Sequence, residues 1–287
     1  MNNKFTVRQF NYRFPDDDAC LEEIKVMRFG EMLDCPNCGK NNKFYKIEGR
    51  KAYSCGFCRH QIHPLAGTIF EKSSTPLQDW FYAIYLMAQT RAGISAKQLE
   101  RMLGVTYKTA WRMFHQIRKL MADDEDMLSG EVEVDETYVG GKSDGRGRTK
   151  GRHIGDKAVV MGMVERQGRA KVRHVKSSGS RSLIPELQAG IKGGSQIYSD
   201  QYPVYINLDK LGYKHASVNH QTNFAIGLTH TQNVENLWSH IKRGIIGVYR
   251  HVDPKYLQSY VDEYAFRYSH RKQPHGAMFD SILSRVC

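Results

Sequence analysis

Three carboxylates and one ammonium occur in an order that suits metal-dependent phosphodiester chemistry. Asp135 falls in the alternating stretch EVEVDETYV, and Asp200 closes a second β-prone stretch. Glu235 and Lys242 are seven residues apart in a helical pattern, which places both side chains on one helix face. Carboxylates that share a site repel each other unless a cation lies between them, and magnesium prefers such oxygen ligands. Taken singly, each acid is better explained as a surface carboxylate, and only the three together favour a site.

The strands and helices predicted around these acids indicate an α/β domain with a mixed sheet. Alternation and helical period predict strands at 131–139, 157–166, 169–176, 195–200, 204–208 and 214–218, and helices at 180–190, 231–247 and 254–271. Val234, Leu237, Trp238 and Ile241 form the apolar stripe of the second helix. This stripe should seat the helix against the sheet, so that Glu235 completes a site with the two aspartates.

Four of the six cysteines have metal-ligand spacing. Cys35, Cys38, Cys55 and Cys58 form two C-x2-C pairs with sixteen residues between them, which is typical of a four-thiolate zinc ribbon holding one structural Zn2+. His60 and His63 are alternative ligands, although four thiolates already fill a tetrahedron. The competing interpretation is a pair of disulfides or a redox motif.

The region after the ribbon has a helix-turn-helix pattern. Capping boxes at Thr75 and Gln78, with Pro76 at the first helical position, and at Ser95 and Gln98 predict two helix starts. The second of these helices stops at Gly104, and a third begins after the turn. Four side chains at the start of this third helix are candidates for contacts with DNA bases and phosphates: Tyr107, Lys108, Thr109 and Arg112. An ordinary helical hairpin is the alternative.

The charge of the chain favours a polyanionic partner. The net charge is +12, and the segment from Lys142 to Lys176 holds eleven Lys or Arg against three acids. The candidate phosphate contacts are Lys142, Arg146, Arg148, Lys150, Arg152 and, beside Lys242, Arg243. A solvated basic loop and hairpin would also explain the run. No apolar run is long enough for a membrane span and no signal-peptide core is seen, so we expect a cytoplasmic protein without a membrane partner.

An acidic break at Asp123–Asp126, followed by Ser129 and Gly130, marks the main domain boundary. We expect three regions. Residues 1–68 hold an N-terminal helix at Asp16–Phe29 and the zinc ribbon, residues 69–126 hold the helix-turn-helix, and residues 127–287 form the catalytic domain.

Several stretches resemble one protein family. CPNCG, YSCGFCRHQIHPLAGTIFEKS, VDETYVGGK and VENLWSHIKRGIIGVYRHVDPKYLQSYVDEYAFRYSHR are similar to the DDE transposases of bacterial insertion sequences, in the subgroup with an N-terminal zinc ribbon. The resemblance implies a ribonuclease H-like catalytic domain that recognises the terminal inverted repeats of the element. It also implies that Asp135, Asp200 and Glu235 hold Mg2+ or Mn2+, two ions per site, and that Lys242 contacts the DNA end being cut.

We therefore expect a transposase that cleaves element ends and joins them to target DNA, acting as a homodimer or higher oligomer on double-stranded DNA and associated with the nucleoid when bound. Two alternatives stay open. One is a zinc-ribbon, helix-turn-helix DNA-binding regulator whose C-terminal domain is a non-catalytic remnant. The other is a metal-dependent nuclease without strand transfer, which shares the same site.

Overall fold

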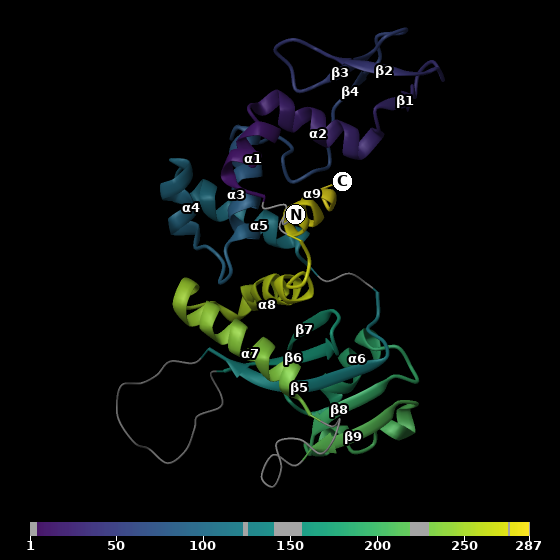
Figure 1. Cartoon of the computed structure of the whole chain (residues 1–287), viewed down its shortest axis with the longest axis vertical. Coiled ribbons are helices and arrows are strands. Elements are labelled where there is room, and N and C mark those ends of the chain that lie inside the picture. Colours follow the sequence, from purple (N-terminus) through teal and green to yellow (C-terminus); the bar gives the residue numbers. More distant parts are fainter. Residues whose placement is uncertain (1–4, 123–125, 141–156, 219–229, 275, 287) are drawn as a thin grey trace. The chain divides into compact units, whose positions relative to one another are not determined.

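The chain folds into two compact units. The computed structural model describes residues 5–122, 126–140, 157–218, 230–274 and 276–286 (Figure 1). Unit 1 comprises Met1–Leu120 together with Gln273–Cys287, and unit 2 comprises Met121–Lys272. From the sequence we expect residues 273–287 in the catalytic domain, whereas in the structure they group with the N-terminal unit.

Unit 1 begins with two helices and an antiparallel ribbon. Helix α2 (Asp17–Phe29) matches the predicted helix, and Asp16 caps it by accepting a hydrogen bond from the Ala19 amide at 2.8 Å. A shorter helix, α1 (Val7–Arg13), was not predicted. The ribbon strands run in the order β1 (Met32–Asp34), β2 (Asn41–Lys46), β3 (Tyr53–Cys55) and β4 (Gln61–Ile62), each antiparallel to the next.

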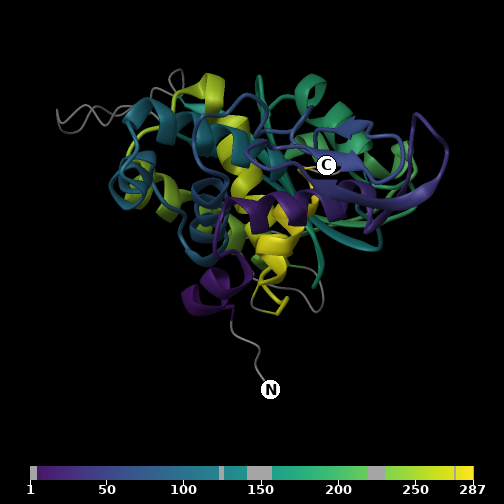
Figure 2. The same cartoon turned by 90° about the horizontal axis from the view of Figure 1, so that it is seen from above.

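The C-terminal segment joins unit 1 through an aromatic core. Helix α9 (Ala277–Ser284) buries Phe279, whose ring centroid lies 5.8 Å from that of Phe14 and 6.5 Å from that of Phe81. Arg13 Nη1 donates to Asp280 Oδ1 at 2.7 Å. In both cartoons the yellow α9 lies beside the purple N-terminal helices (Figures 1 and 2). Burial of this phenylalanine explains why 273–287 belong to unit 1.

Three further helices complete unit 1: α3 (Leu77–Gln89), α4 (Ala96–Leu103) and α5 (Tyr107–Leu120). Ser95 caps α4 by accepting from the Gln98 amide at 3.1 Å, and α4 ends at left-handed Gly104, as predicted.

The capping box predicted for α3 is wrong. Pro76 is the N-cap rather than the first helical residue, and no side chain of the cap bonds the helix. Instead, Asp17 Oδ1 accepts from the Gln78 amide at 2.9 Å, and Gln78 Nε2 donates to the Phe14 carbonyl at 2.8 Å. Asp17 at the start of α2 and the Phe14 carbonyl just before that helix therefore supply the partners that a local box would have supplied.

Unit 2 is built on a five-stranded mixed sheet in the order β7-β6-β5-β8-β9. Its strands are β5 (Glu131–Val139), β6 (Ala158–Glu165), β7 (Ala170–Val175), β8 (Gln196–Asp200) and β9 (Lys214–Val218). β5 pairs antiparallel with β6, and β6 with β7, while β5 pairs parallel with β8, and β8 with β9. The strand predicted at 204–208 is absent from the described structure, which has 3-10 turns at Pro203–Tyr205 and Leu208–Leu211. Pro203 favours the first turn because its φ is fixed.

Helices cover both faces of this sheet (Figure 1). Helices α7 (Gln232–Gly244) and α8 (Pro254–Ser269) share one apolar core with β6 and β7, while α6 (Ser180–Gly190) and the 3-10 turns cover the other face. Val132 and Val134 of β5 belong to the α6 core. Because side chains alternate along a strand, Glu133 and Asp135 face α7. Within the described residues, no helix is long and apolar enough to cross a membrane.

Candidate active site

The two aspartates lie on adjacent central strands of unit 2. β5 and β8 are parallel neighbours, and Glu133 of β5 pairs with Tyr198 of β8. Asp135 and Asp200 each lie two residues beyond that pair, and both are partly buried. Residues two apart in a strand point to the same face of the sheet, so Asp135 shares the face of Glu133, and Asp200 shares that of Tyr198. The sheet therefore brings these two carboxylates, distant in sequence, to neighbouring places.

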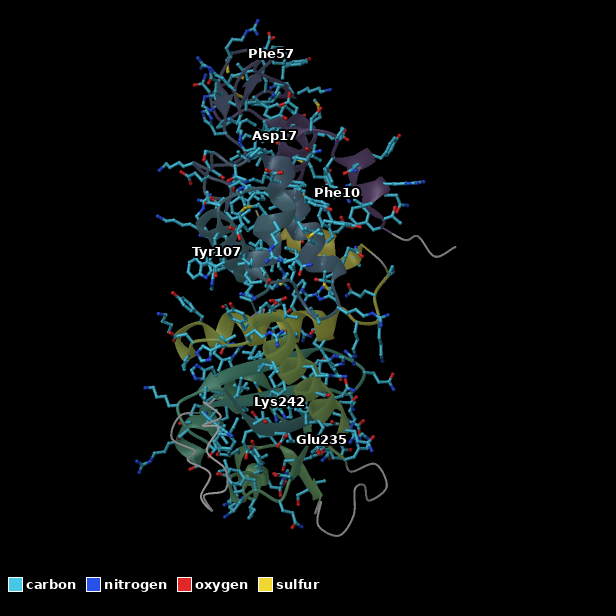
Figure 3. All side chains as sticks on the ribbon, turned by 90° about the vertical axis from the view of Figure 1, so that its left-hand side faces the viewer. Phe10, Asp17, Phe57, Tyr107, Glu235 and Lys242 are labelled. Atoms are coloured by element: carbon cyan, nitrogen blue, oxygen red, sulfur yellow. The ribbon has the colours of Figure 1, made fainter. Side chains whose placement is uncertain are left out.

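Helix α7 adds the third acid. Trp238 Nε1 donates to Asp135 Oδ2 at 2.7 Å, which fixes the helix to β5 directly at the site. Glu235 lies one turn before Trp238 and is exposed, and its Oε1 accepts from Thr231 Oγ1 at 3.1 Å. Lys242 is exposed two turns further along α7; Figure 3 shows both labelled side chains on this helix.

The electrostatics of the site show that the acids interact. Burial raises the pKa of Asp135 to about 6, the Trp238 hydrogen bond opposes that rise, and repulsion from Asp200 and Glu235 adds to it. Both other carboxylates are therefore close enough to disfavour its charge. The site gathers negative charge that a cation would relieve.

A fourth acid, Glu136, was not predicted. Burial raises its pKa to about 7, a hydrogen bond from the Tyr205 hydroxyl at 2.8 Å opposes this rise, and repulsion from Asp135 and Asp200 adds to it. Glu136 follows Asp135 in the strand and faces the opposite side of the sheet. The adjacent acids in the stretch VDETYV are the signal that could have drawn attention to it.

The acids are less tightly gathered than the cysteines. Across the described ranges, the four cysteines are the one group of three or more His, Cys, Asp or Glu residues whose ligand atoms all lie within 4.8 Å of one another. Asp135, Asp200 and Glu235 are therefore not drawn together within that span.

A glycine lets α7 approach the sheet at this place. Gly162 of β6 pairs with Asp135, and a Cβ there would lie 2.6 Å from Trp238 Cη2 and 3.0 Å from Val234 Cγ2. We expect Gly162→Ala to displace the indole and to lower the free energy of unfolding by about 1–3 kcal/mol, the usual cost of overpacking. Denaturant titration would measure the loss, and the Trp238 indole N–H resonance should shift as its bond to Asp135 breaks.

The control for this prediction is Gly193→Ala, because a Cβ at Gly193 meets nothing within 4 Å. This variant should unfold like the wild type. Equal stability of the two variants would show that close packing of α7 does not depend on Gly162.

The four cysteines of unit 1 form a structural zinc site. Cys35 Sγ lies 3.5 Å from Cys58 Sγ, and Cys38 Sγ lies 3.9 Å from Cys55 Sγ. A tetrahedron with zinc–sulfur bonds of about 2.3 Å requires sulfurs about 3.8 Å apart, so the residues fit the ion. Burial raises the pKa of the Cys55 thiol, but hydrogen bonds from the backbone of Cys58 and Phe57 outweigh it and bring the pKa to about 6.

The two C-x2-C turns that carry the zinc ligands, here called knuckles, have a further support that the spacing of the cysteines does not reveal. Asn42 is buried, its Oδ1 accepts from the Gly56 amide at 3.1 Å, and its Nδ2 donates to Cys55 Sγ at 3.4 Å. This side chain therefore holds the second knuckle from the neighbouring strand.

The candidate DNA contacts of unit 1 lie at the start of α5. Tyr107 and Lys108 are exposed, and Tyr107 is labelled in Figure 3. Thr109 is partly buried, and its hydroxyl lies 3.0 Å from that of Thr106. Arg112 is turned toward its own unit, because its Nη2 donates to Ser73 Oγ at 3.2 Å and its guanidinium lies 5.5 Å from the Trp80 ring.

The remaining candidates divide between α7 and the segment 141–156. Arg243 is exposed, and its Nε donates to the Ser239 carbonyl at 3.1 Å. Five predicted phosphate contacts lie outside the described residues: Lys142, Arg146, Arg148, Lys150 and Arg152.

Comparison with known proteins matches both parts of the chain. Residues 127–269 match the model of the ISXO2-like transposase domain, and residues 15–61 match that of the transposase zinc-ribbon domain. A protein of the transposable element ISH50 from Halobacterium salinarum is 27% identical over 214 residues, covering 69% of this chain and 71% of that protein. A transposase-like protein from Haemophilus influenzae is 27% identical over 90 residues, covering 31% of this chain and 72% of that protein. The predicted resemblance is confirmed: the chain belongs to the ISXO2-like transposases of insertion sequences, with a zinc ribbon ahead of the transposase domain.

Proposed function

We propose that the protein cleaves the ends of its insertion sequence and joins them to target DNA in a divalent-metal-dependent reaction. The observation that carries this proposal is that Asp200 and Glu235 lie close enough to Asp135 for their charges to raise its pKa, within the matched transposase domain. The strand order and directions of unit 2 support a ribonuclease H-like fold, with both aspartates on adjacent central strands.

The donor set suits Mg2+ or Mn2+. All three side chains offer hard carboxylate oxygens, and repulsion at Asp135 leaves a place where positive charge is favourable. When bound, two such ions would activate the attacking oxygen and stabilise the leaving one. The chain's own residues then orient the reaction: Trp238 holds Asp135 in place, and Lys242 provides a cation on the Glu235 face of α7 for a DNA phosphate.

DNA recognition is assigned to unit 1 and to the basic positions of unit 2. We propose that α4, the turn at Gly104 and α5 form a helix-turn-helix whose exposed Tyr107 and Lys108 approach the terminal inverted repeats. Thr109, Arg112, Arg243 and the basic positions between 142 and 152 supply further contacts, mainly to phosphates. Because an element has two ends, at least two subunits would act together on DNA.

The test is a reaction with labelled double-stranded DNA that carries an element end, a target plasmid, and Mg2+ or EDTA. A transposase gives metal-dependent nicking at the end and products in which the end is joined to the plasmid. Nicks without joined products would identify a nuclease. Binding to the end without any nick would identify a DNA-binding regulator.

A further inference from the structure

A fully buried carboxylate, Glu133, joins β5 to the start of α7. Its Oε2 accepts from the amides of Asn233 at 2.8 Å and Val234 at 3.2 Å, and its Oε1 accepts from Asn233 Nδ2 at 2.8 Å. The residue at the N-cap of α7, Thr231, makes no side-chain cap bond of its own. The strand that carries Asp135 therefore supplies the cap of the helix that carries Glu235.

An arginine extends this contact to the strand that carries Asp200. Arg166 Nε donates to Glu133 Oε1 at 3.1 Å, and its Nη2 donates to the His230 carbonyl at 3.1 Å, just before α7. Its guanidinium lies 3.8 Å from the ring centroid of Tyr198 in β8. The arginine therefore contacts the β8 side of the site as well as the start of α7.

Three of the residues in these contacts have the same relation to the three acids. Glu133 lies two residues before Asp135, Tyr198 lies two before Asp200, and Asn233 lies two before Glu235. A strand repeats every two residues, so contacts that hold one side chain in place also limit the position of the residue two places further along the strand. In the helix, bonds to the main-chain amides set the height and rotation of the first turn.

We propose that Glu133, Arg166, Tyr198 and Asn233 form a positioning network that sets the distances between the three acids. The inference rests on the proposed metal-dependent function of those acids. A buried ion pair alone contributes little net stability compared with well-packed apolar residues. The Glu133–Arg166 pair has a second role, because it lies beside the site and links the three segments that carry the acids.

The test compares Glu133→Gln with a matched control, Glu263→Gln. Glutamine keeps the volume, but its amide nitrogen cannot accept the bonds that a carboxylate oxygen accepts. Glu263 is also fully buried in unit 2 and accepts from Arg267 Nη2 at 2.7 Å and from the Tyr249 hydroxyl at 3.0 Å. It belongs to α8 and lies outside the network, so its variant reports the general effect of losing a buried carboxylate.

Two readouts on the full chain separate positioning from stability. Hydrogen exchange at the first turn of α7 should become at least about tenfold faster in Glu133→Gln relative to the exchange of β6. The Mn2+ concentration that half-saturates binding, followed by the electron paramagnetic resonance of free Mn2+, should rise by about 10–100-fold, as for other groups that orient metal ligands. The Mn2+ concentration that half-saturates end cleavage should rise in parallel. Glu263→Gln should retain wild-type values for all three.

The proposal is overturned if Glu133→Gln matches the wild type in exchange and Mn2+ binding, or if Glu263→Gln shifts both equally. If Glu133→Gln does not fold, Asn233→Ala decides instead, because it removes one bond to Glu133 and should raise the Mn2+ requirement severalfold. Failure of the proposed function looks different: the wild type would then show no metal-dependent cleavage in any condition, whereas the exchange of α7 would still respond to Glu133→Gln.

Discussion

Asp135→Asn is expected to abolish cleavage of element-end DNA while leaving the protein folded. A carboxylate that holds the ions contributes several kcal/mol of charge stabilisation in the transition state, so the rate should fall by at least about 10³-fold. Asparagine matches the shape and can still accept the Trp238 hydrogen bond through its carbonyl oxygen. Gel assays of Mg2+-dependent nicking would give the rate, and binding to end DNA should stay within about twofold of the wild type.

The stability of the same variant provides an independent check. In the folded protein, burial and the repulsion from Asp200 and Glu235 raise the pKa of Asp135 to about 6, so its charged form opposes folding at pH 7. Neutral asparagine removes that repulsion. In EDTA, Asp135→Asn should therefore melt at the wild-type temperature or above it, although it is inactive.

Glu186→Gln is the control for these experiments, because Glu186 of α6 is partly exposed and its Oε2 lies 3.6 Å from Arg173 Nε, on the opposite helical layer from α7. It should cleave like the wild type. Full Mg2+-dependent activity of Asp135→Asn would show that the three acids are not the metal ligands. A melting temperature below that of the wild type would contradict the expected loss of repulsion.

The amino-acid sequence was sufficient for the elements with strong local patterns. Alternation in EVEVDETYV predicted β5 at its observed bounds, and the apolar stripe of Val234, Leu237, Trp238 and Ile241 predicted α7 and its seating on the sheet. The spacing of the four cysteines predicted the ribbon. In each case the local pattern and the tertiary environment favour the same structure.

Other features depend on partners that are distant in sequence. Nothing local shows that α3 is capped by Asp17, or that Phe279 draws the C-terminal segment into unit 1. The segment 204–208 has β-prone residues, but Tyr205 is buried against the sheet and donates to Glu136, which favours a turn. Tertiary contacts override propensity at such places.

The same limit applies to the candidate site. Spacing singled out Asp135, Asp200 and Glu235, and the fold places the last two close enough to Asp135 to raise its pKa, although their catalytic role stays a prediction. Alternation in EVEVDETYV places Glu133 on the same strand face as Asp135, but it cannot show that the start of a helix covers Glu133. Trp238 was assigned to the apolar stripe, since hydropathy does not reveal the bond from its indole nitrogen to Asp135.

Cys55→Ser is expected to unfold the ribbon by removing its zinc. Cys55 is fully buried and its Sγ lies 3.9 Å from that of Cys38, so a serine there leaves three thiolates and a poor fourth ligand. In modules of this size the free energy of zinc binding, about 10–16 kcal/mol in peptides, is folding free energy. The purified wild type should carry one zinc per chain by metal analysis, and the variant should carry far less.

Loss of the ribbon should also loosen α2, which is tied to it. Lys46 Nζ pairs with Asp18 Oδ1 at 2.5 Å, and Arg28 Nη1 donates to the Ala66 carbonyl at 2.6 Å just beyond the ribbon. Hydrogen exchange of α2 should therefore rise in Cys55→Ser and in the wild type treated with a chelator. Cys20→Ala is the control, because Cys20 is buried in α2 but lies outside the four-thiolate cluster. It should keep its zinc and a folded ribbon, and a folded, zinc-free Cys55→Ser ribbon would show that the strands hold without the metal.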